Sequence, residues 1–277
     1  MEPVTRRQAC RTAVYFLAML TAVMLCLVPA GCNQHQAETD SLFQVSTLGA
    51  LLVGIYDGEA TYADLAEKGD FGLGTFNALD GEMICLDGIF YQIRTDGNAC
   101  PVDSSQKAPF ANLAFFRPDA TEALQQLDGY ESLKAYLDSR LKTVNVPCAV
   151  RVDGTFSFMK ARSVSAQEQP YPPLADAVAG QTVFEFHDVQ GTMVGFRMPA
   201  YMDGGINVSG YHFHFITGDR TAGGHVLECA VDRASAAIDY LHDVTMVLPG
   251  DDAFYAADLD STDAGRTERL SALRDLL

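Results

Sequence analysis

The sequence predicts an α+β fold made of two mixed or antiparallel β-sheet domains with a few covering helices. Short apolar runs with two-residue alternation recur from residue 82 onward. Asp-Gly pairs lie between several of these runs and favour tight hairpin turns, because both central residues of such a turn need a positive φ. Helical spacing of apolar residues is confined to a few segments. With 48% hydrophobic and 20% charged residues, the 277-residue chain has an ordinary globular composition.

The first 31 residues have the pattern of an export signal. Three arginines among the first eleven residues precede an apolar run over 12–30. The ending Ala30-Gly31-Cys32 resembles a bacterial lipobox, in which the cysteine becomes the lipidated first residue of the mature chain. Two alternatives are cleavage after Ala30 without lipidation and retention of the apolar run as an anchor. In all three cases we expect the protein to be exported, either lipid-anchored at the outer face of a bacterial membrane or secreted.

A polar tether over residues 32–41 leads into an N-terminal mixed-sheet domain, expected over 42–172. Helical spacing over 48–68 indicates two short helices interrupted at Asp57-Gly58. Three glycines directly after this segment indicate a change to extended chain.

Strands dominate the remainder of this domain. The runs 82–86 and 89–93 flank Asp87-Gly88 and predict a hairpin. A further strand is expected over 111–116. Helical spacing over 121–141, split near one glycine, predicts an amphipathic helix that packs on the sheet.

A second hairpin is expected over 148–164, with its turn at Asp153-Gly154. The proline-rich run 169–173 cannot continue a central strand, so we place the domain boundary there. The C-terminal sheet domain is then expected over 173–277. Its predicted elements are strands over 182–187, 192–198 (around a turn at Gln190-Gly191), 211–217 and 225–231, and a closing helix over 263–277.

Four cysteines remain once the signal and Cys32 are set aside, namely Cys85, Cys100, Cys148 and Cys229. Their spacings match no zinc-knuckle pattern. An oxidising compartment would permit disulfides, but Cys85 and Cys229 lie in apolar runs where a buried free thiol is the commoner outcome. The sequence leaves the pairing open.

The chain carries 19 Lys and Arg against 36 Asp and Glu, a net charge of -17. This balance argues against nucleic-acid binding, which usually requires a basic face. An anionic substrate would need locally placed cations, either a basic side chain or a metal ion, to offset the surrounding negative charge.

Three of the six histidines fall within fourteen positions, at His212, His214 and His225. Side chains alternate faces along a strand, so His212 and His214 share one face. The glycine-rich stretch 217–224 suits a loop that returns the chain antiparallel. A register that places His214 opposite His225 brings their Cβ atoms to roughly 5 Å and allows all three imidazoles to converge.

Three histidines without a fourth protein ligand are typical of a catalytic zinc site, which keeps one position open for water or substrate. Zn²⁺ or another divalent ion is therefore the expected cofactor. A histidine group without metal is one alternative, although three buried unpaired imidazoles would be costly. A cupin-type oxygenase is another, but it usually places a glutamate about four positions after the second histidine, where this chain has Gly218.

Two charged residues share strand faces with apolar side chains. Arg162 lies on the face of Phe156 and Phe158, and Glu82 lies on the face of Ile84. Inward charges usually have a partner or a function. The alternative from pattern alone is that each is a strand-end charge that reaches solvent.

Several ordered blocks of residues resemble the α-acetolactate decarboxylase family over roughly 42–259. They are GTF at 74–76, LDGEMI at 79–84, FYQI at 90–93, ARSV at 161–164, PYPPL at 170–174, GYHFHF at 210–215 and GGHVL at 223–227. The specificity lies in their combination and order.

This resemblance implies a homodimeric two-domain α+β enzyme, a carboxy-lyase that converts 2-acetolactate to acetoin and carbon dioxide. It implies that the three histidines bind zinc. It also implies that Glu82 and Arg162 are the active-site acid and cation, and that Thr75, together with Arg162, contacts the substrate. The family places a C-terminal carboxylate at the metal; here Glu268 and Asp275 both remain candidates.

The expected chemistry uses the metal to polarise the 3-oxo and 2-hydroxyl groups, with Arg162 stabilising charge and Glu82 transferring a proton. The expected partner is a small-molecule substrate, without nucleic acid, and with membrane contact only through the N-terminal anchor or signal. Two alternatives are a non-catalytic metal- or solute-binding lipoprotein and a divergent decarboxylase of another 2-hydroxy-3-oxo acid.

Overall fold

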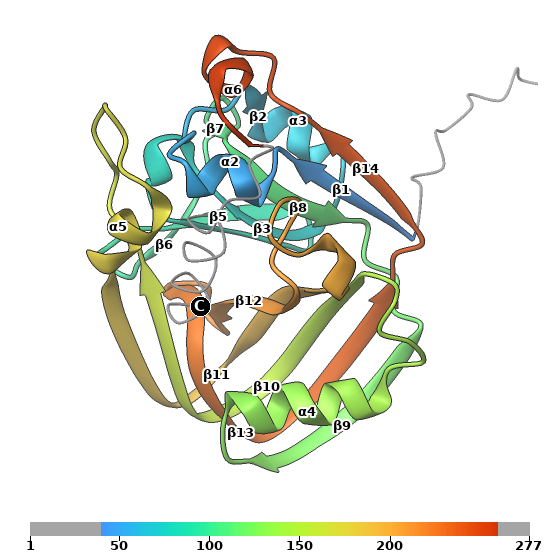
Figure 1. Ribbon diagram of the computed structural model, residues 1–277. Coiled ribbons are helices and arrows are strands. Elements are labelled where there is room, and N and C mark those ends of the chain that lie inside the picture. Colours follow the sequence, from blue (N-terminus) through green and yellow to red (C-terminus); the bar gives the residue numbers. More distant parts are fainter. Residues whose placement is uncertain (1–39, 260–277) are drawn as a thin grey trace, which may run out of the picture. The chain divides into compact units, whose positions relative to one another are not determined.

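Two β-sheets form the framework of the computed structural model, which describes residues 40–259 (Figure 1). The predicted export signal, Cys32 and the closing helix over 263–277 lie outside the described residues. All described residues belong to one compact unit. No helix among them is long and apolar enough to cross a membrane.

The first sheet is mixed and has the strand order β14-β1-β8-β3-β4-β5-β6. Only the β1–β14 pair is parallel. Its strands are β1 (Ser41–Val45), β3 (Phe71–Thr75), β4 (Glu82–Leu86), β5 (Ile89–Ile93), β6 (Ala99–Pro101), β8 (Phe110–Ala114) and β14 (Asp243–Val247). A separate small pair joins β2 (Ala60–Thr61) to β7 (Lys107–Ala108).

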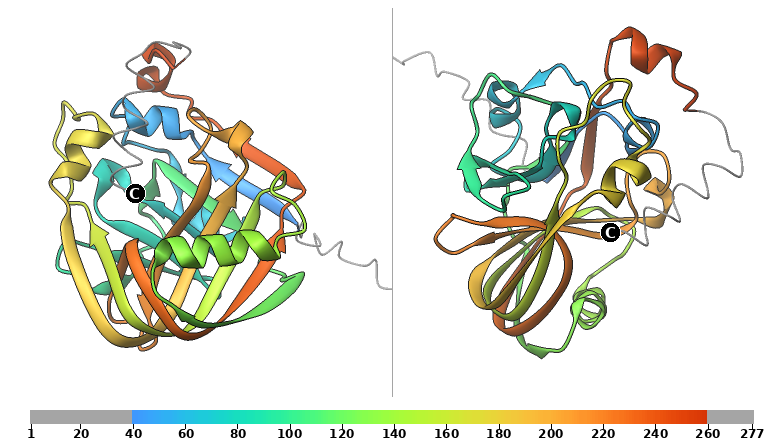
Figure 2. Two further views of the ribbon diagram at one scale, coloured as in Figure 1. Left: turned by 60° about the horizontal axis from the view of Figure 1, so that its bottom comes forward. Right: turned by 90° about the vertical axis from the view of Figure 1, so that its left-hand side faces the viewer.

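The second sheet is antiparallel and has the order β10-β11-β12-β13-β9, with β10 also paired to β13. Four of its strands therefore close on themselves, and their strong curvature is visible in Figure 2. The strands are β9 (Ala120–Leu127), β10 (Cys148–Ser163), β11 (Thr182–Met198), β12 (Gly210–Thr217) and β13 (Gly223–Tyr240).

Short helices cover these sheets and their connections. They are α2 (Leu48–Leu52), α3 (Tyr62–Ala66), α4 (Tyr130–Arg140), α5 (Leu174–Ala179) and α6 (Asp252–Ala256), with 3₁₀ turns η1 (Asn77–Leu79) and η2 (Ala200–Met202). The apolar face of α4 packs Leu133 and Leu137 against β9 and β13. A second core joins the two sheets, with Leu73 and Ile84 from the first and Phe196 and Ile216 from the second.

The α+β class and the β4–β5 hairpin are confirmed. Asp87 and Gly88 have φ values of 55° and 77°, as the predicted turn requires. The four cysteines of the described residues are free, and Cys85 and Cys229 are buried as expected.

Two predicted turns of the second sheet are wrong. Asp153-Gly154 and Gln190-Gly191 lie inside the continuous strands β10 and β11, where Gly154 pairs with Gly191. A Cβ on Gly154 would approach the Ala234 Cβ to 2.4 Å, and one on Gly191 would approach the Phe215 ring to 2.4 Å. These glycines permit close approach across a curved sheet and do not form turns.

The helix predicted over 121–141 is also wrong in its first half, because residues 120–127 form β9. That strand gains its backbone hydrogen bonds from β13, a partner more than a hundred residues away. The helix begins only at Tyr130, whose backbone N–H donates to Glu228 Oε1 at 2.6 Å.

The two sheets do not divide at a single position of the chain such as residue 172, where the domain boundary was predicted. Strands β9 and β10 precede that position and join the second sheet, whereas β14 follows it and joins the first. The proline-rich segment connects β10 to α5 above the second sheet and contains a cis Gln169–Pro170 bond.

Candidate metal centre

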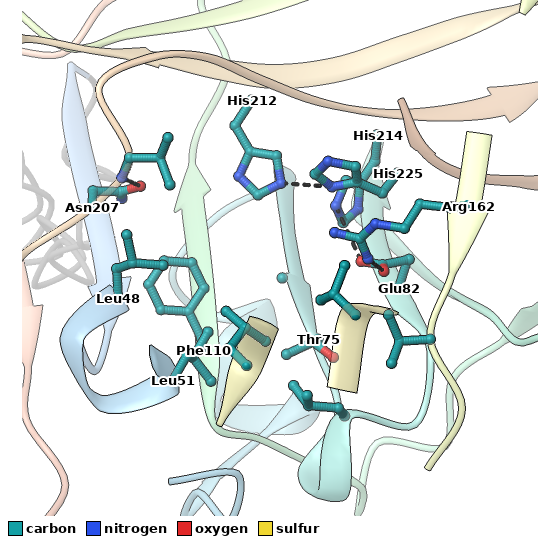
Figure 3. Close-up of a pocket in the computed structure, with 16 residues that line it drawn as sticks. Leu48, Leu51, Thr75, Glu82, Phe110, Arg162, Asn207, His212, His214 and His225 are labelled. Atoms are coloured by element: carbon teal, nitrogen blue, oxygen red, sulfur yellow. Dashed lines mark hydrogen bonds and ion pairs between the residues drawn. The ribbon is translucent and has the colours of Figure 1, made fainter. Parts of the chain in front are cut away.

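Three imidazoles meet where β12 and β13 begin to pair. His214 lies opposite His225 in the antiparallel register, as the sequence predicted, and His212 lies two residues earlier on the same face. The ring centroids are 4.8 to 5.2 Å apart. One nitrogen from each ring lies within 4.8 Å of the others, a spacing suited to one shared ion (Figure 3).

The tautomer of His214 follows from its surroundings. Its Nδ1 lies 2.8 Å from the Met83 carbonyl oxygen, which can only accept, so Nδ1 carries the proton. Its Nε2 therefore presents a lone pair. Nε2 is buried and has no hydrogen-bond partner among the described residues. A ligand nitrogen oriented by a carbonyl on its other side is the usual arrangement at metal sites, so these residues fit a divalent ion.

Burial keeps all three rings neutral. Burial, together with a smaller contribution from the nearby Arg162 charge, lowers the pKa of His212 to about 3. The pKa values of His214 and His225 lie well below the ordinary value, with burial again the largest cause. Neutral imidazoles are the form that binds metal, so no proton has to be displaced near neutral pH.

Glu82 and Arg162 form a buried ion pair beside the histidines. Glu82 begins β4 and Arg162 lies near the end of β10, opposite His225. Glu82 Oε1 accepts from Arg162 Nη1, and Glu82 Oε2 lies 3.4 Å from His214 Nε2. Both residues are at most 6% exposed, so they are inward charges and do not reach solvent as strand ends.

Burial disfavours the charged form of both members of this pair. Burial raises the pKa of Glu82 and lowers that of Arg162, and each shift is opposed by the partner's charge. Arg162 Nε is buried without a hydrogen-bond partner among the described residues. The guanidinium thus retains a donor for a ligand, and burial shifts the equilibrium of the Glu82 carboxyl group toward its protonated form while the Arg162 charge opposes that shift.

Thr75 lies opposite Glu82 in the β3–β4 register and faces the same cavity. Its hydroxyl donates to the Gly81 carbonyl at 2.7 Å. Because that proton is committed, the hydroxyl oxygen is left to accept a hydrogen bond from a bound molecule.

A cavity extends from the histidines between the two sheets and helices α2 and α5. Its polar end carries the three histidines, Glu82, Arg162 and Thr75, all of the site residues predicted from sequence. Its other end is apolar and was not predicted. That end is lined by Leu48, Leu51, Leu79, Phe110, Val164, Leu174, Val178 and Val208, with Asn207 beside them.

The apolar end had no distinguishing signal in the sequence, because its residues read as ordinary core positions of short helices and strands. The two candidate C-terminal carboxylates, Glu268 and Asp275, lie outside the described residues. The arrangement as a whole can hold a divalent ion by three neutral nitrogens and place an acid and a cation next to a ligand bound there.

A family model described as "Alpha-acetolactate decarboxylase" matches residues 42–261 of the chain. A protein of that name from Methanosarcina mazei is 51% identical over 233 residues, which cover 84% of this chain and 80% of the relative. The one from Bacillus licheniformis is 44% identical, over 81% of this chain and 88% of the relative.

Solved structures agree with these sequence matches. The crystal structure of alpha-acetolactate decarboxylase from Bacillus subtilis strain 168 superimposes with a TM-score of 0.79 and 41% identity, covering 83% of this chain and 98% of the other. A Staphylococcus aureus protein described as similar to that enzyme gives a TM-score of 0.80 and 31% identity, covering 86% of this chain and 100% of the other.

Proposed function

Because this chain belongs to the alpha-acetolactate decarboxylase family, we propose that it converts 2-acetolactate to acetoin and carbon dioxide with a divalent metal held by His212, His214 and His225. The observation that carries the metal site is the convergence of three neutral imidazoles next to a buried Glu82–Arg162 pair. When bound, a zinc ion would supply Lewis acidity toward the 3-oxo and 2-hydroxyl oxygens of the substrate.

Arg162 binds the carboxylate side of the substrate in this proposal. Its Nε has no hydrogen-bond partner among the described residues, and it is the one basic side chain among the residues that line the cavity, apart from the histidines. A charge-assisted hydrogen bond from this guanidinium both orients the substrate and balances its negative charge. The net charge of -17 makes such a local cation necessary.

Glu82 transfers a proton to the carbon that loses carbon dioxide. Breaking the bond between C1 and C2 releases the carboxylate carbon as carbon dioxide. The electron pair of that bond forms a double bond between C2 and C3, while the π pair of the C3 carbonyl moves onto its oxygen. When the carbonyl re-forms, the pair between C2 and C3 takes a proton at C2, which yields acetoin. Burial raises the pKa of Glu82, which favours the protonated form that this step needs. Delivery from one side fixes the configuration of the product.

Thr75 accepts a hydrogen bond from the substrate hydroxyl. Its own proton is directed at the Gly81 carbonyl, so only its lone pairs face the cavity. This contact orients the 2-hydroxyl group relative to Glu82, which lies opposite Thr75 on the neighbouring strand.

The decisive experiment uses the full chain purified in detergent. Its bound metals are quantified, and acetoin and carbon dioxide are measured from racemic 2-acetolactate before and after removal of metal with a chelator. We expect about one divalent ion per chain, activity that disappears on chelation and activity that returns with Zn²⁺. Activity that is insensitive to complete metal removal contradicts the proposal.

A wider substrate range is a second candidate, favoured by the apolar side chains that line one end of the cavity. A 2-hydroxy-3-oxo acid with a longer alkyl group would then place that group against Leu48, Leu51 and Leu174. Comparison of kcat/KM for the methyl- and ethyl-substituted acids tests this.

We further propose a homodimer. Strand β14 forms an edge of the first sheet, all five of its residues are exposed, and Val244 and Val247 are each 48% exposed. An uncovered apolar edge strand favours pairing with another chain, here a second copy. Light scattering should give twice the chain mass, and Val244→Lys should shift it toward the monomer.

Export with a lipid anchor at Cys32 is the proposed localisation, supported by the lipobox-like sequence. Incorporation of labelled palmitate in the native chain, and its loss in Cys32→Ser, would establish lipidation. A labelled Cys32→Ser chain would contradict it.

A further inference from the structure

Three buried amide side chains connect the first sheet to the loop that precedes β12. Gln44 lies on β1, Asn112 lies opposite it on β8, and Asn207 lies in the loop after η2. None is more than 1% exposed. The reaction does not use them.

Asn207 is the centre of this amide cluster. Its Nδ2 donates to Gln44 Oε1 at 2.8 Å and to Asn112 Oδ1 at 3.2 Å, and its Oδ1 accepts from the Val208 backbone N–H at 2.8 Å. Gln44 Nε2 donates in turn to the Ile206 carbonyl at 2.8 Å. Each lost partner would leave a buried polar atom unsatisfied, which costs about 1–3 kcal/mol, so the cluster holds the loop strongly to the first sheet.

The same loop supports one wall of the cavity. The Ile206 carbonyl also accepts from the Leu48 backbone N–H at 3.0 Å, and the Gly205 carbonyl accepts from Gly49 at 2.9 Å. These bonds fix the first turn of α2, which presents Leu48 and Leu51 to the cavity. In Figure 3, Asn207 and Leu48 lie on the side of the cavity opposite Glu82 and Arg162.

His212 is the metal-site histidine nearest to this loop along the chain. It follows Asn207 by five residues. Within the described residues it pairs with Phe196 of β11, whereas the pairing of β12 with β13 begins at His214. His212 is also only half-buried, while His214 and His225 are buried. His212 is thus held in the second sheet by β11 alone, whereas the β13 pairing also holds His214 and His225, and the loop is the chain segment that fixes the start of its strand.

We infer that Asn207 is a positioning residue, which acts through Gln44 and Asn112 to hold His212 at the metal site and α2 at the cavity wall. This inference rests on the proposed metal function. If it holds, residues of the first sheet contribute to metal affinity, although all three imidazoles belong to the second sheet.

The test compares Zn²⁺ affinity of the full chain and of Asn207→Asp, measured by competition with a chromophoric chelator. Aspartate keeps the shape of asparagine but directs an acceptor at Gln44 Oε1 and Asn112 Oδ1. Groups that orient metal ligands typically contribute about 10–100-fold in metal affinity, and we expect a loss in that range. The visible spectrum of the Co²⁺-loaded variant should change as well, since its coordination loses a fixed His212.

The matched control is Tyr240→Phe. The Tyr240 hydroxyl is buried at the far end of β13 and accepts from the Lys142 backbone N–H at 2.7 Å. Its loss should lower the melting temperature while the zinc affinity stays that of the native chain. A purely structural role for Asn207 predicts the same result for Asn207→Asp.

Asn112→Ala gives a milder variant, because it removes only the longer of the two Asn207 Nδ2 contacts. We expect a smaller loss of zinc affinity, and this variant decides the question if Asn207→Asp does not fold. Native zinc affinity in the variants overturns the positioning role. A native chain that binds no divalent metal instead overturns the proposed function.

Discussion

The metal centre and the amide cluster are both buried and polar, but they differ in how their hydrogen bonds are completed. In the amide cluster, both hydrogens of Asn207 Nδ2 have acceptors. In the metal centre, His214 Nε2 and Arg162 Nε have no hydrogen-bond partner among the described residues. Buried polar groups are normally satisfied, so the exceptions indicate where a ligand completes the set. The comparison separates a scaffold from the site that it supports.

Replacement of a metal ligand should have the largest effect. His214→Ala removes the nitrogen with the uncommitted lone pair, and we expect loss of bound zinc together with turnover at the background rate. Metal analysis and the acetoin assay measure both. His187→Ala, at an exposed histidine, is the matched control. Full zinc occupancy in His214→Ala would show that the unpartnered nitrogen of His214 does not mark a metal site.

Glu82→Gln should separate metal binding from proton transfer. The glutamine retains the shape of the side chain and leaves the histidines intact, so zinc content should match the native chain. Loss of the acid should lower kcat by about 10²–10⁴-fold and weaken the stereochemical preference of acetoin, measured by chiral chromatography. Glu67→Gln, at an exposed position, provides the control. Native turnover in Glu82→Gln would exclude it as the proton donor.

Arg162→Met should destabilise the metal-free fold, because it leaves the Glu82 carboxylate buried without its partner. Removing one member of a buried ion pair costs about 3–5 kcal/mol in unfolding free energy. Urea denaturation measures this value. The double variant Arg162→Met with Glu82→Gln should recover most of it, and a double variant as unstable as the single one would show that packing dominates.

Outside the metal centre, Asp239 Oδ1 and Gln181 Oε1 are also buried without a hydrogen-bond partner among the described residues. The pKa of Asp239 is raised to about 6, mainly by burial and further by the Asp119 and Asp40 charges, against a hydrogen bond that its Oδ2 accepts from the Arg117 backbone N–H. The folded chain thus binds this proton more tightly than the unfolded one. The contribution of Asp239 to stability should be greatest below pH 4 and fall by at most about 3 kcal/mol as the pH rises through 6. Asp239→Asn should remove this contribution in unfolding measured across pH.

The smallest effect is expected at Glu228, whose carboxylate caps α4. Glu228 Oε1 accepts from the backbone N–H groups of Tyr130 and Cys229 at 2.6 and 2.9 Å. Glu228→Ala should cost about 1 kcal/mol of stability, as loss of a helix cap does, without changing zinc affinity. Glu228→Gln retains an acceptor and should cost less; equal losses would show that the charge, and not the cap, is responsible.

The metal centre was predictable because its geometry is local. His212 and His214 share a strand face by parity alone, and a short loop sets the register with His225. The β4–β5 hairpin followed from two turn residues in the same way. Glu82 and Arg162, eighty positions apart, were identified as inward charges, but their pairing required the fold.

The remainder depended on contacts between distant segments. Gly154 and Gly191 resemble turn residues until the curvature of β10 and β11 is known. The strand at 120–127 has a helical apolar pattern, and pairing with β13 overrides it. Asn207 carries no signal of its own, because its role arises from Gln44 and Asn112 on another sheet.

The hydrogen bond from His214 to the Met83 carbonyl has a consequence for how this family can vary. The acceptor belongs to the main chain, so no exchange of side chain at position 83 deletes it, provided the strand keeps its place. A point mutation at position 83 therefore does not remove the group that orients His214. Substitutions at position 83 therefore act through the packing of its buried side chain, while the oxygen that orients His214 stays with the main chain.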